Sequence, residues 1–183
     1  MGLTAIFFFD GSLDIAAAKL FYRPEFSHPW PFENHWFWQF FYYLAPVLTA
    51  GLMLGGVGLL FASLFASPWQ NWLLGLRKDI LFVFLSIALG SGLVINSVFK
   101  PYWGRPRPRQ VQELGGQYTH TPFWKKGVTA QGKSFPCGHS SIGFSMVVFW
   151  FIWRKSRPKA ARVAMVASLV TGGLLGAGRM AAG

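Results

Sequence analysis

The sequence predicts an all-α fold, a bundle of helices that crosses a membrane several times. Of its 183 residues, 52% are hydrophobic and 13% are charged, which lies outside the usual balance of soluble proteins. Two long runs, residues 44–66 and 80–99, contain no charged residue. The first run has 23 residues, and as a helix it measures roughly 34 Å at ~1.5 Å per residue, enough to span a bilayer. We expect one membrane domain over residues 1–183.

Two shorter apolar runs in the second half, residues 137–153 and 163–178, are also expected to span the membrane. The short connection between them carries five cations and no acid: Arg154, Lys155, Arg157, Lys159 and Arg162. The two runs are therefore predicted to form a tight helical hairpin with a basic turn. Residues 100–136, which precede the hairpin, are polar and are expected to form the loop that carries the functional site.

Residues 1–43 are predicted to contain part of a first helix and a segment that lies along the membrane interface. Residues 1–9 are apolar but too short to cross a bilayer alone, and we interpret them as the stub of a longer helix. Residues 10–43 combine acids with many aromatic side chains. Apolar residues recur there at helical spacing, which predicts a short amphipathic helix: Leu13, Ala17, Leu20 and Phe21.

The net charge of +11 is unusual in so apolar a chain. Most basic proteins of this size bind nucleic acid, but the polar surface here is too small for that, so no nucleic-acid partner is expected. The basic turn after residue 153 favours a cytoplasmic location, which places residues 100–136 outside. That loop itself holds seven cations against the single acid Glu113: Lys100, Arg105, Arg107, Arg109, Lys125, Lys126 and Lys133. Charge counting alone therefore leaves the orientation open, and the loop cations need another explanation.

The first candidate site segment is residues 100–109, where three prolines hold four cations on a stiff, extended stretch. Arginine binds phosphate oxygens in a bidentate way and lysine acts as a point charge, so together they suit a tetrahedral dianion. The alternative is a juxtamembrane basic patch that attracts anionic lipid headgroups.

The second candidate segment, residues 134–141, comes immediately before an apolar helix. A helix N-terminus offers unpaired N–H groups and a positive dipole end to an anion, and Gly138 lets the backbone approach that anion closely. His139 lies in the first helical turn, where it can give a proton to the leaving oxygen of a phosphate ester. A histidine at a membrane interface can also be incidental to function.

The two segments together resemble the first two signature motifs of the type 2 phosphatidic acid phosphatase family. The first motif, Lys-x6-Arg-Pro, is filled by Lys100, Arg107 and Pro108. The second, Pro-x-Gly-His, is filled by residues 136–139, and Arg179 falls where the third motif of the family begins. The resemblance implies the membrane helical bundle that this family shares with the haloperoxidases.

The resemblance implies dephosphorylation of a lipid phosphate or pyrophosphate through a phosphohistidine, at the outer face of the membrane. His139 would protonate the leaving group. The phosphate would be bound by residues from all three motifs: Lys100, Arg107, Cys137, Gly138 and Arg179. Arg105 and Ser140 are possible accessory contacts. The implied partner is a membrane lipid phosphate, no cofactor is expected, and a bacterial inner membrane with the site facing the periplasm is the preferred location.

The sequence departs from the family pattern in the third motif. Its nucleophilic histidine would fall at position 185 and its aspartate later, but the sequence ends at Gly183. We interpret the chain as truncated within this motif and inactive as given. Cys137 stands where serine is usual, and a thiol is a weaker hydrogen-bond donor than a hydroxyl. Gly178 also stands where serine is common.

Other chemistries fit the sequence less well than this hypothesis. A cysteine-based phosphatase loop would need arginine six positions after Cys137, where the sequence has Gly143. The remaining histidines have no partner at metal-ligand spacing, so no metal is expected. The open alternatives are a lipid-to-lipid phosphotransferase, which uses the same intermediate, and a non-catalytic protein that binds anionic lipids. A soluble haloperoxidase is disfavoured by the uncharged run at residues 44–66.

Overall fold

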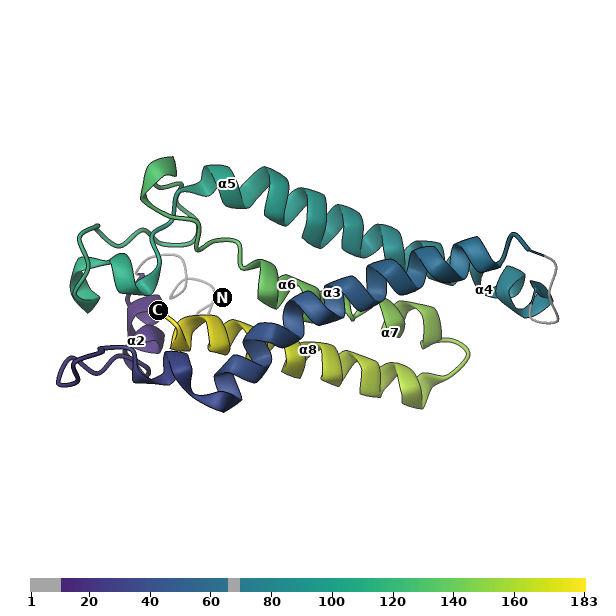
Figure 1. Cartoon of the computed structure of the whole chain (residues 1–183), viewed down its shortest axis with the longest axis horizontal. Helices are drawn as coiled ribbons and strands as arrows, with labels where there is room; N and C mark the ends of the chain where they lie inside the picture. The colour runs from purple at the N-terminus through teal and green to yellow at the C-terminus, as the bar shows by residue number, and fades with distance from the viewer. Residues whose placement is uncertain (1–10, 66–69) are drawn as a thin grey trace, which may run out of the picture.

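The computed structural model describes residues 11–65 and 70–183, and within these residues all regular elements are helices (Figure 1). Only an isolated bridge between Val111 and Tyr118 pairs extended segments in this described part. The predicted all-α membrane bundle is confirmed. The expected helix stub at residues 1–9 lies outside the described residues.

Long apolar helices build the body of the molecule. Helix α3 spans Trp36–Ala62. Helix α4 (Gln70–Leu85) continues into the π-helix η2 (Ser86–Phe99) and the short helix α5 (Lys100–Trp103). Helix α8 spans Pro158–Ala181. By length and composition, α3, α8 and the stretch Asn71–Gln110 are each able to cross a membrane. The chain is an integral membrane protein.

The helices α3 and α8 begin before the spans that the sequence predicted, residues 44–66 and 163–178. Helix α3 begins at Trp36, well before residue 44. Residues 36–43 are mostly aromatic, and hydropathy alone does not mark them as part of a spanning helix. The imidazole of His35 caps it by accepting a hydrogen bond from the Phe37 N–H at 3.3 Å. The helix ends at Ala62, and Arg77 then donates hydrogen bonds to the hydroxyl and carbonyl oxygens of Ser63. Residue 66 of the expected span lies outside the described residues.

The expected helical hairpin consists of α6 (Gly138–Ser145), α7 (Val148–Trp153) and α8. Helices α6 and α8 approach closely, because a Cβ atom on Gly143 would lie only 2.6 Å from the Gly172 backbone. The Ser168 hydroxyl donates to the backbone oxygens of Gly143 and Phe144, both at 2.9 Å. The core of the bundle brings side chains from α3, η2, α6 and α8 together: Ala45, Ile87, Ile142 and Leu175.

The predicted amphipathic helix is present as α2 (Ser12–Lys19). It packs on the loop after α5 through a small core that contains Ala18, Trp30, Val111 and Leu114. Leu13 and Leu20, two of the positions that suggested the helix, are exposed instead. Contact with the loop decides which face of α2 is buried. The local spacing of apolar residues does not predict that contact.

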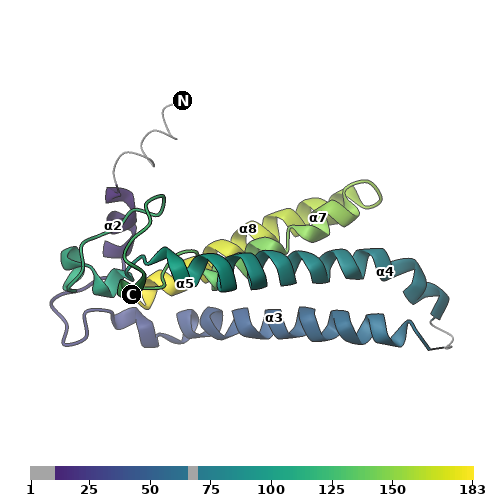
Figure 2. The same cartoon turned by 90° about the horizontal axis from the view of Figure 1, so that it is seen from above.

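Residues 104–137 fold over one end of the bundle and contain three short helices, η3 (Pro108–Gln110), η4 (Gln112–Leu114) and η5 (Thr129–Gln131). Gly104 adopts a φ of 73°, and a side chain there would meet the Val128 backbone. Figure 2 shows α2, this loop and the end of α8 gathered at one end, with the end of α3, the start of α4 and the turn after α7 at the other. The bundle therefore has a loop-covered end and, opposite it, a basic end.

Candidate active site

A polar cavity of about 430 Å³ opens at the loop-covered end of the bundle. Every site residue predicted from the sequence lines it: Lys100, Arg105, Arg107, Cys137, Gly138, His139, Ser140 and Arg179. These residues come from four separate segments, which are α5, the loop, α6 and α8. Tertiary structure therefore joins the three sequence motifs in one cavity, which we call the phosphate pocket.

The ends of helices position the charged groups of the phosphate pocket. Lys100 is the first residue of α5, and Arg107 immediately precedes η3. Arg179 lies in the last turn of α8. His139 lies in the first turn of α6, next to the unpaired N–H groups at that helix N-terminus. Three cations and one imidazole thus converge in a cavity whose helix end also favours an anion.

Arg105 is held in place by the segments around it. Its Nε donates to the Thr121 carbonyl oxygen at 2.9 Å, and its Nη2 forms an ion pair with Asp14 of α2 at 2.8 Å. Only 19% of the Arg105 side chain is exposed. The Ser134 N–H also donates to the Arg105 carbonyl oxygen at 3.1 Å. Arg105 therefore carries a paired charge and ties α2 to the rim of the phosphate pocket.

A polar network behind α6 supports the helix end that carries His139. The amide of Asn96 donates to the Ser91 carbonyl oxygen at 2.6 Å, across one turn of the π-helix η2. The hydroxyls of Ser91 and Ser141 are 2.6 Å apart, and Ser141 Oγ donates to the Gly138 carbonyl oxygen at 2.8 Å. A Cβ atom on Gly138 would collide with the Asn96 side chain. Glycine at this position is therefore required for the close approach of η2 to α6.

The serine hydroxyls near Cys137 are directed away from the phosphate pocket. Ser140 donates to the Gly172 carbonyl oxygen at 2.7 Å, and Ser134 donates to the Pro106 carbonyl oxygen at 2.8 Å. A hydroxyl has a single O–H donor, so in this arrangement neither proton points to an anion in the pocket. Cys137 precedes α6 and makes no side-chain cap. The donors left at this helix end are backbone N–H groups.

Tyr42 and Lys133 also line the phosphate pocket, although neither belongs to a motif. The Tyr42 ring lies 5.0 Å from the His139 ring, and the Arg179 guanidinium lies 5.1 Å from the centre of the Tyr42 ring. Tyr42 belongs to α3, far from the motifs in sequence. In the sequence, Lys133 is one of seven loop cations, and no motif or spacing distinguishes it from Lys125 or Lys126.

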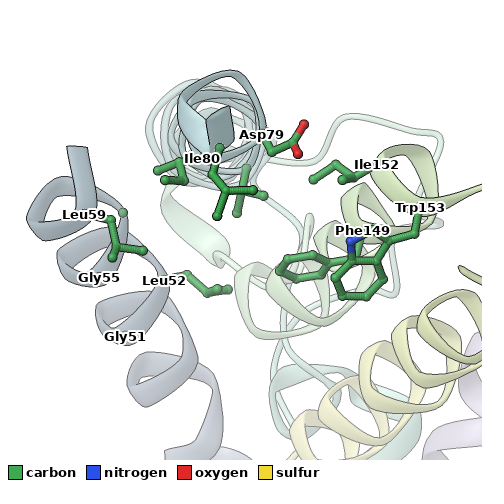
Figure 3. A pocket seen from close by; sticks show the side chains of 12 residues that line it. Gly51, Leu52, Gly55, Leu59, Asp79, Ile80, Phe149, Ile152 and Trp153 are labelled. Carbon is green, nitrogen blue, oxygen red and sulfur yellow. The ribbon is translucent and has the colours of Figure 1, made fainter. Parts of the chain in front are cut away.

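A second cavity, of about 330 Å³, lies between α3, α4 and α7. Figure 3 shows Leu52 and Leu59 of α3 on one side of it and Phe149 and Trp153 of α7 on the other. Its lining contains one charged residue, Asp79, whose carboxylate would repel a phosphate. In the described part of the chain, no three His, Cys, Asp or Glu side chains gather as metal ligands. The phosphate pocket is thus the candidate active site.

The fold and the pocket define a membrane-embedded helical protein with a cationic, histidine-containing site. The chain belongs to the PAP2 superfamily, whose model matches residues 79–183, the stretch that holds the first two motifs and Arg179. It is 35% identical over 150 residues to a lipid A 4'-phosphatase of Francisella tularensis subsp. novicida (strain U112). That match covers 81% of this chain and 62% of the relative. No solved structure matches the chain.

Proposed function

We propose that the chain provides the phosphate-binding and proton-donating part of a lipid phosphate phosphatase. The observation that carries this proposal is the convergence of Lys100, Arg107, Arg179 and His139 in one cavity. Three cations offset the charge of a phosphate dianion, and the N-terminus of α6 adds backbone donors. Membership of the PAP2 superfamily and the similarity to a lipid A 4'-phosphatase support the same reaction class.

The proposed reaction passes through a phosphohistidine. A histidine nitrogen attacks phosphorus, the bond from phosphorus to the lipid oxygen breaks, and His139 gives its proton to that oxygen. Water then attacks the phosphohistidine while His139 takes up a proton, and inorganic phosphate leaves. The cations stabilise the negative charge of phosphorus-bound oxygens throughout.

The attacking histidine is not among these 183 residues. The family resemblance assigns it to the sixth residue after the third-motif arginine, and His139 is the last histidine of the sequence. Hydrolysis requires a protein in which this histidine follows Arg179 at the family spacing.

We also propose that the phosphate pocket faces the outside of a bacterial inner membrane. Arg77 and Lys78 belong to α4, and Arg77 donates to Ser63 directly after the end of α3. The end of α3 and the turn after α7, which carries further cations, lie opposite the pocket (Figure 2). Clusters of lysine and arginine in short loops favour the cytoplasmic side. In this orientation a substrate would come from the outer leaflet.

The test uses the protein extended through the third motif, purified in detergent, and measures phosphate release from several lipid phosphates. A lipid A phosphate is tested beside phosphatidate, phosphatidylglycerol phosphate and undecaprenyl pyrophosphate. We expect release from at least one lipid and a loss of at least roughly a hundredfold for His139→Gln, since general acids contribute about 10²–10⁴ in rate. Quenching in alkaline detergent should trap a phosphorylated protein, because the P–N bond of a phosphohistidine is labile in acid and stable in alkali.

Arg154→Gln is the matched control, because Arg154 lies over Trp150 at the other end of the bundle. This variant should retain full activity. The proposal is wrong if the folded protein releases phosphate from none of these lipids, or if His139→Gln and Arg154→Gln behave alike. Transfer of phosphate to a second lipid in place of water would identify a phosphotransferase.

A further inference from the structure

The cavity between α3, α4 and α7 extends from the basic end of the bundle toward its middle (Figure 3). Leu59, Leu76 and Trp153 line it near the basic end, and Gly51 and Val83 line it nearer the middle. Its volume of about 330 Å³ falls within the range of ligand pockets, roughly 300–1,000 Å³. We call this cavity the basic-end groove.

We propose that the basic-end groove binds a membrane phospholipid whose headgroup ends in a primary ammonium group, as in phosphatidylethanolamine. An acyl chain would lie along the groove, and the ammonium group would contact Asp79. The inference does not depend on the proposed phosphatase function, because the groove and the phosphate pocket have no lining residue in common. It is carried by the shape of the groove, by its carboxylate and by the cations around its opening.

Glycine residues on α3 leave room for an acyl chain. Gly51, Gly55 and Gly56 line the groove. A Cβ atom on Gly51 or Gly55 would have no atom within 4 Å, whereas a Cβ atom on Gly56 would contact the Phe84 ring at 3.6 Å. Side chains of the described residues therefore do not fill the space beside this part of α3.

Apolar side chains form the floor and one wall of the groove. Leu52 and Val83 line it and also pack against the core of the bundle, so the floor is fixed. The rings of Phe149 and Trp153 stack, with 5.3 Å between their centres and 27° between their planes, and form a wall on α7. Hydrocarbon gains free energy by leaving water for such a surface. The groove therefore suits an acyl chain.

Asp79 is the group that would select the headgroup. It is partly buried, and Figure 3 shows its carboxylate directed from α4 toward α7. The ion pairs among the described residues involve Asp14 and Glu33, so Asp79 has no cationic partner in this part of the chain. A carboxylate that loses water beside apolar groups is stabilised by an opposite charge that also donates hydrogen bonds. A primary ammonium group supplies both.

Cations lie around the opening of the groove, where the phosphate of the same lipid would be placed. Lys78 precedes Asp79 and is exposed. Arg154 and Lys155 follow Trp153 directly and are also exposed. Lysine and arginine at a membrane surface attract lipid phosphates. The groove thus matches a headgroup that carries both charges, whereas a purely anionic headgroup would be repelled by Asp79.

Isothermal titration in detergent tests the inference with three dioctanoyl phospholipids. These are phosphatidylethanolamine, the anionic phosphatidylglycerol, and phosphatidylcholine, whose quaternary ammonium group has no N–H donor. The protein extended through the third motif is used. We expect phosphatidylethanolamine to bind roughly tenfold more tightly than either of the others. It should also raise the midpoint of thermal unfolding, because a ligand that binds the folded state stabilises it.

Two glycines of α3 provide a matched pair of variants. Gly55→Leu fills the groove and should weaken phosphatidylethanolamine binding by roughly tenfold or more. Gly58 lies on the same helix and has equally open space around a Cβ atom, but it does not line the groove. Gly58→Leu should therefore bind the lipid as the natural protein does.

A second pair of variants tests the headgroup contact. Asp79→Asn should remove the preference for phosphatidylethanolamine over phosphatidylglycerol. Glu25→Gln removes an exposed acid from the segment between α2 and η1 and should preserve that preference. Thermal unfolding confirms that each variant is folded, and Asp79→Asn decides the matter if Gly55→Leu does not fold.

Three results would overturn the proposal. The first is equal affinity of the folded protein for the three lipids, and the second is an equal effect of Gly55→Leu and Gly58→Leu on that affinity. The third is dissociation of a dimer by Gly55→Leu with unchanged lipid affinity, which would assign the groove to contact between two copies of the chain. None of these results concerns phosphate release, so the proposed function stands or falls separately.

Discussion

The aromatic ring of Tyr42 lies against the imidazole of His139, with 5.0 Å between the ring centres and 35° between the ring planes. Arg179 approaches the same tyrosine ring at 5.1 Å. One side chain of α3 therefore contacts two residues that the family motifs place on α6 and α8. This contact fixes the imidazole and the guanidinium relative to each other.

Loss of the Tyr42 ring should weaken phosphate binding. A cation over an aromatic face contributes about 0.5–1 kcal/mol at exposed sites, so Tyr42→Ala should raise the dissociation constant for orthovanadate roughly two- to fivefold. Tyr42→Phe keeps the ring and should bind as the natural protein does. Isothermal titration of both variants in detergent checks this, and equal losses for Ala and Phe would assign the effect to the hydroxyl instead.

Lys133 should contribute to phosphate binding although no motif includes it, because it lines the phosphate pocket. Lys133→Gln should weaken orthovanadate binding roughly tenfold, or by about 1.4 kcal/mol. Lys126→Gln removes the same charge from the same loop but outside the pocket, and should change the affinity by less than about twofold at moderate salt. Equal effects of both substitutions would indicate a diffuse basic surface and contradict a defined site.

Substitution of Gly138 should destabilise the protein through Asn96. The added methyl group of Gly138→Ala overlaps the Asn96 side chain, and overpacking of this kind costs about 1–3 kcal/mol. The measurement is the midpoint of thermal unfolding in detergent. Shortening of the opposing side chain in the double variant Gly138→Ala, Asn96→Ala should restore part of the loss.

Gly173→Ala is the control for this experiment, because a Cβ atom at Gly173 has no atom within 4 Å. Alanine is the better helix former by up to about 1 kcal/mol, so this variant should be as stable as the natural protein or slightly more stable. A similar loss of stability at Gly138 and Gly173 would show that the contact with Asn96 is not the cause.

The ion pair between Asp14 and Arg105 should hold α2 against the loop. Hydrogen bonds to charged groups contribute about 1.5–3 kcal/mol, so Asp14→Asn should speed backbone hydrogen exchange in residues 104–137 by roughly tenfold or more. Asp79→Asn removes an acid at the other end of the bundle and should leave exchange in the loop unchanged. Recovery of slow exchange in the charge-reversed pair Asp14→Arg, Arg105→Asp would demonstrate the pairing directly.

Much of the fold could be predicted from local patterns in the sequence. Uncharged runs located the helices of the bundle because burial of apolar side chains in a bilayer requires long uninterrupted segments. Motif spacing located His139, Lys100 and Arg107 because each motif lies within a short stretch of chain. The exact start of α3 was missed because Trp36, Gln39 and Tyr43 lower the mean hydropathy of residues 36–43, which are helical nevertheless.

The remainder of the site depends on contacts between residues that are far apart in sequence. Arg105 and Ser140 line the pocket as expected, but Arg105 Nε and Nη2 also donate to Thr121 and Asp14, and the Ser140 hydroxyl donates to Gly172. These partners belong to segments that are far away in the sequence, so the local spacing of residues does not predict them.

The sequence by itself determined that the chain is a helical membrane protein with a cationic phosphate motif, because hydrophobicity and motif spacing are local properties. Only the tertiary structure decided that Tyr42 and Lys133 join the phosphate pocket, and that one cation of the loop is already paired with Asp14. The physical reason is that the packing of the helices and the loop brings these side chains together from segments that are far apart in the sequence. The cluster of loop cations noted in the sequence thus separates into groups that line the pocket, such as Lys100 and Arg107, and groups that lie outside it, such as Lys126.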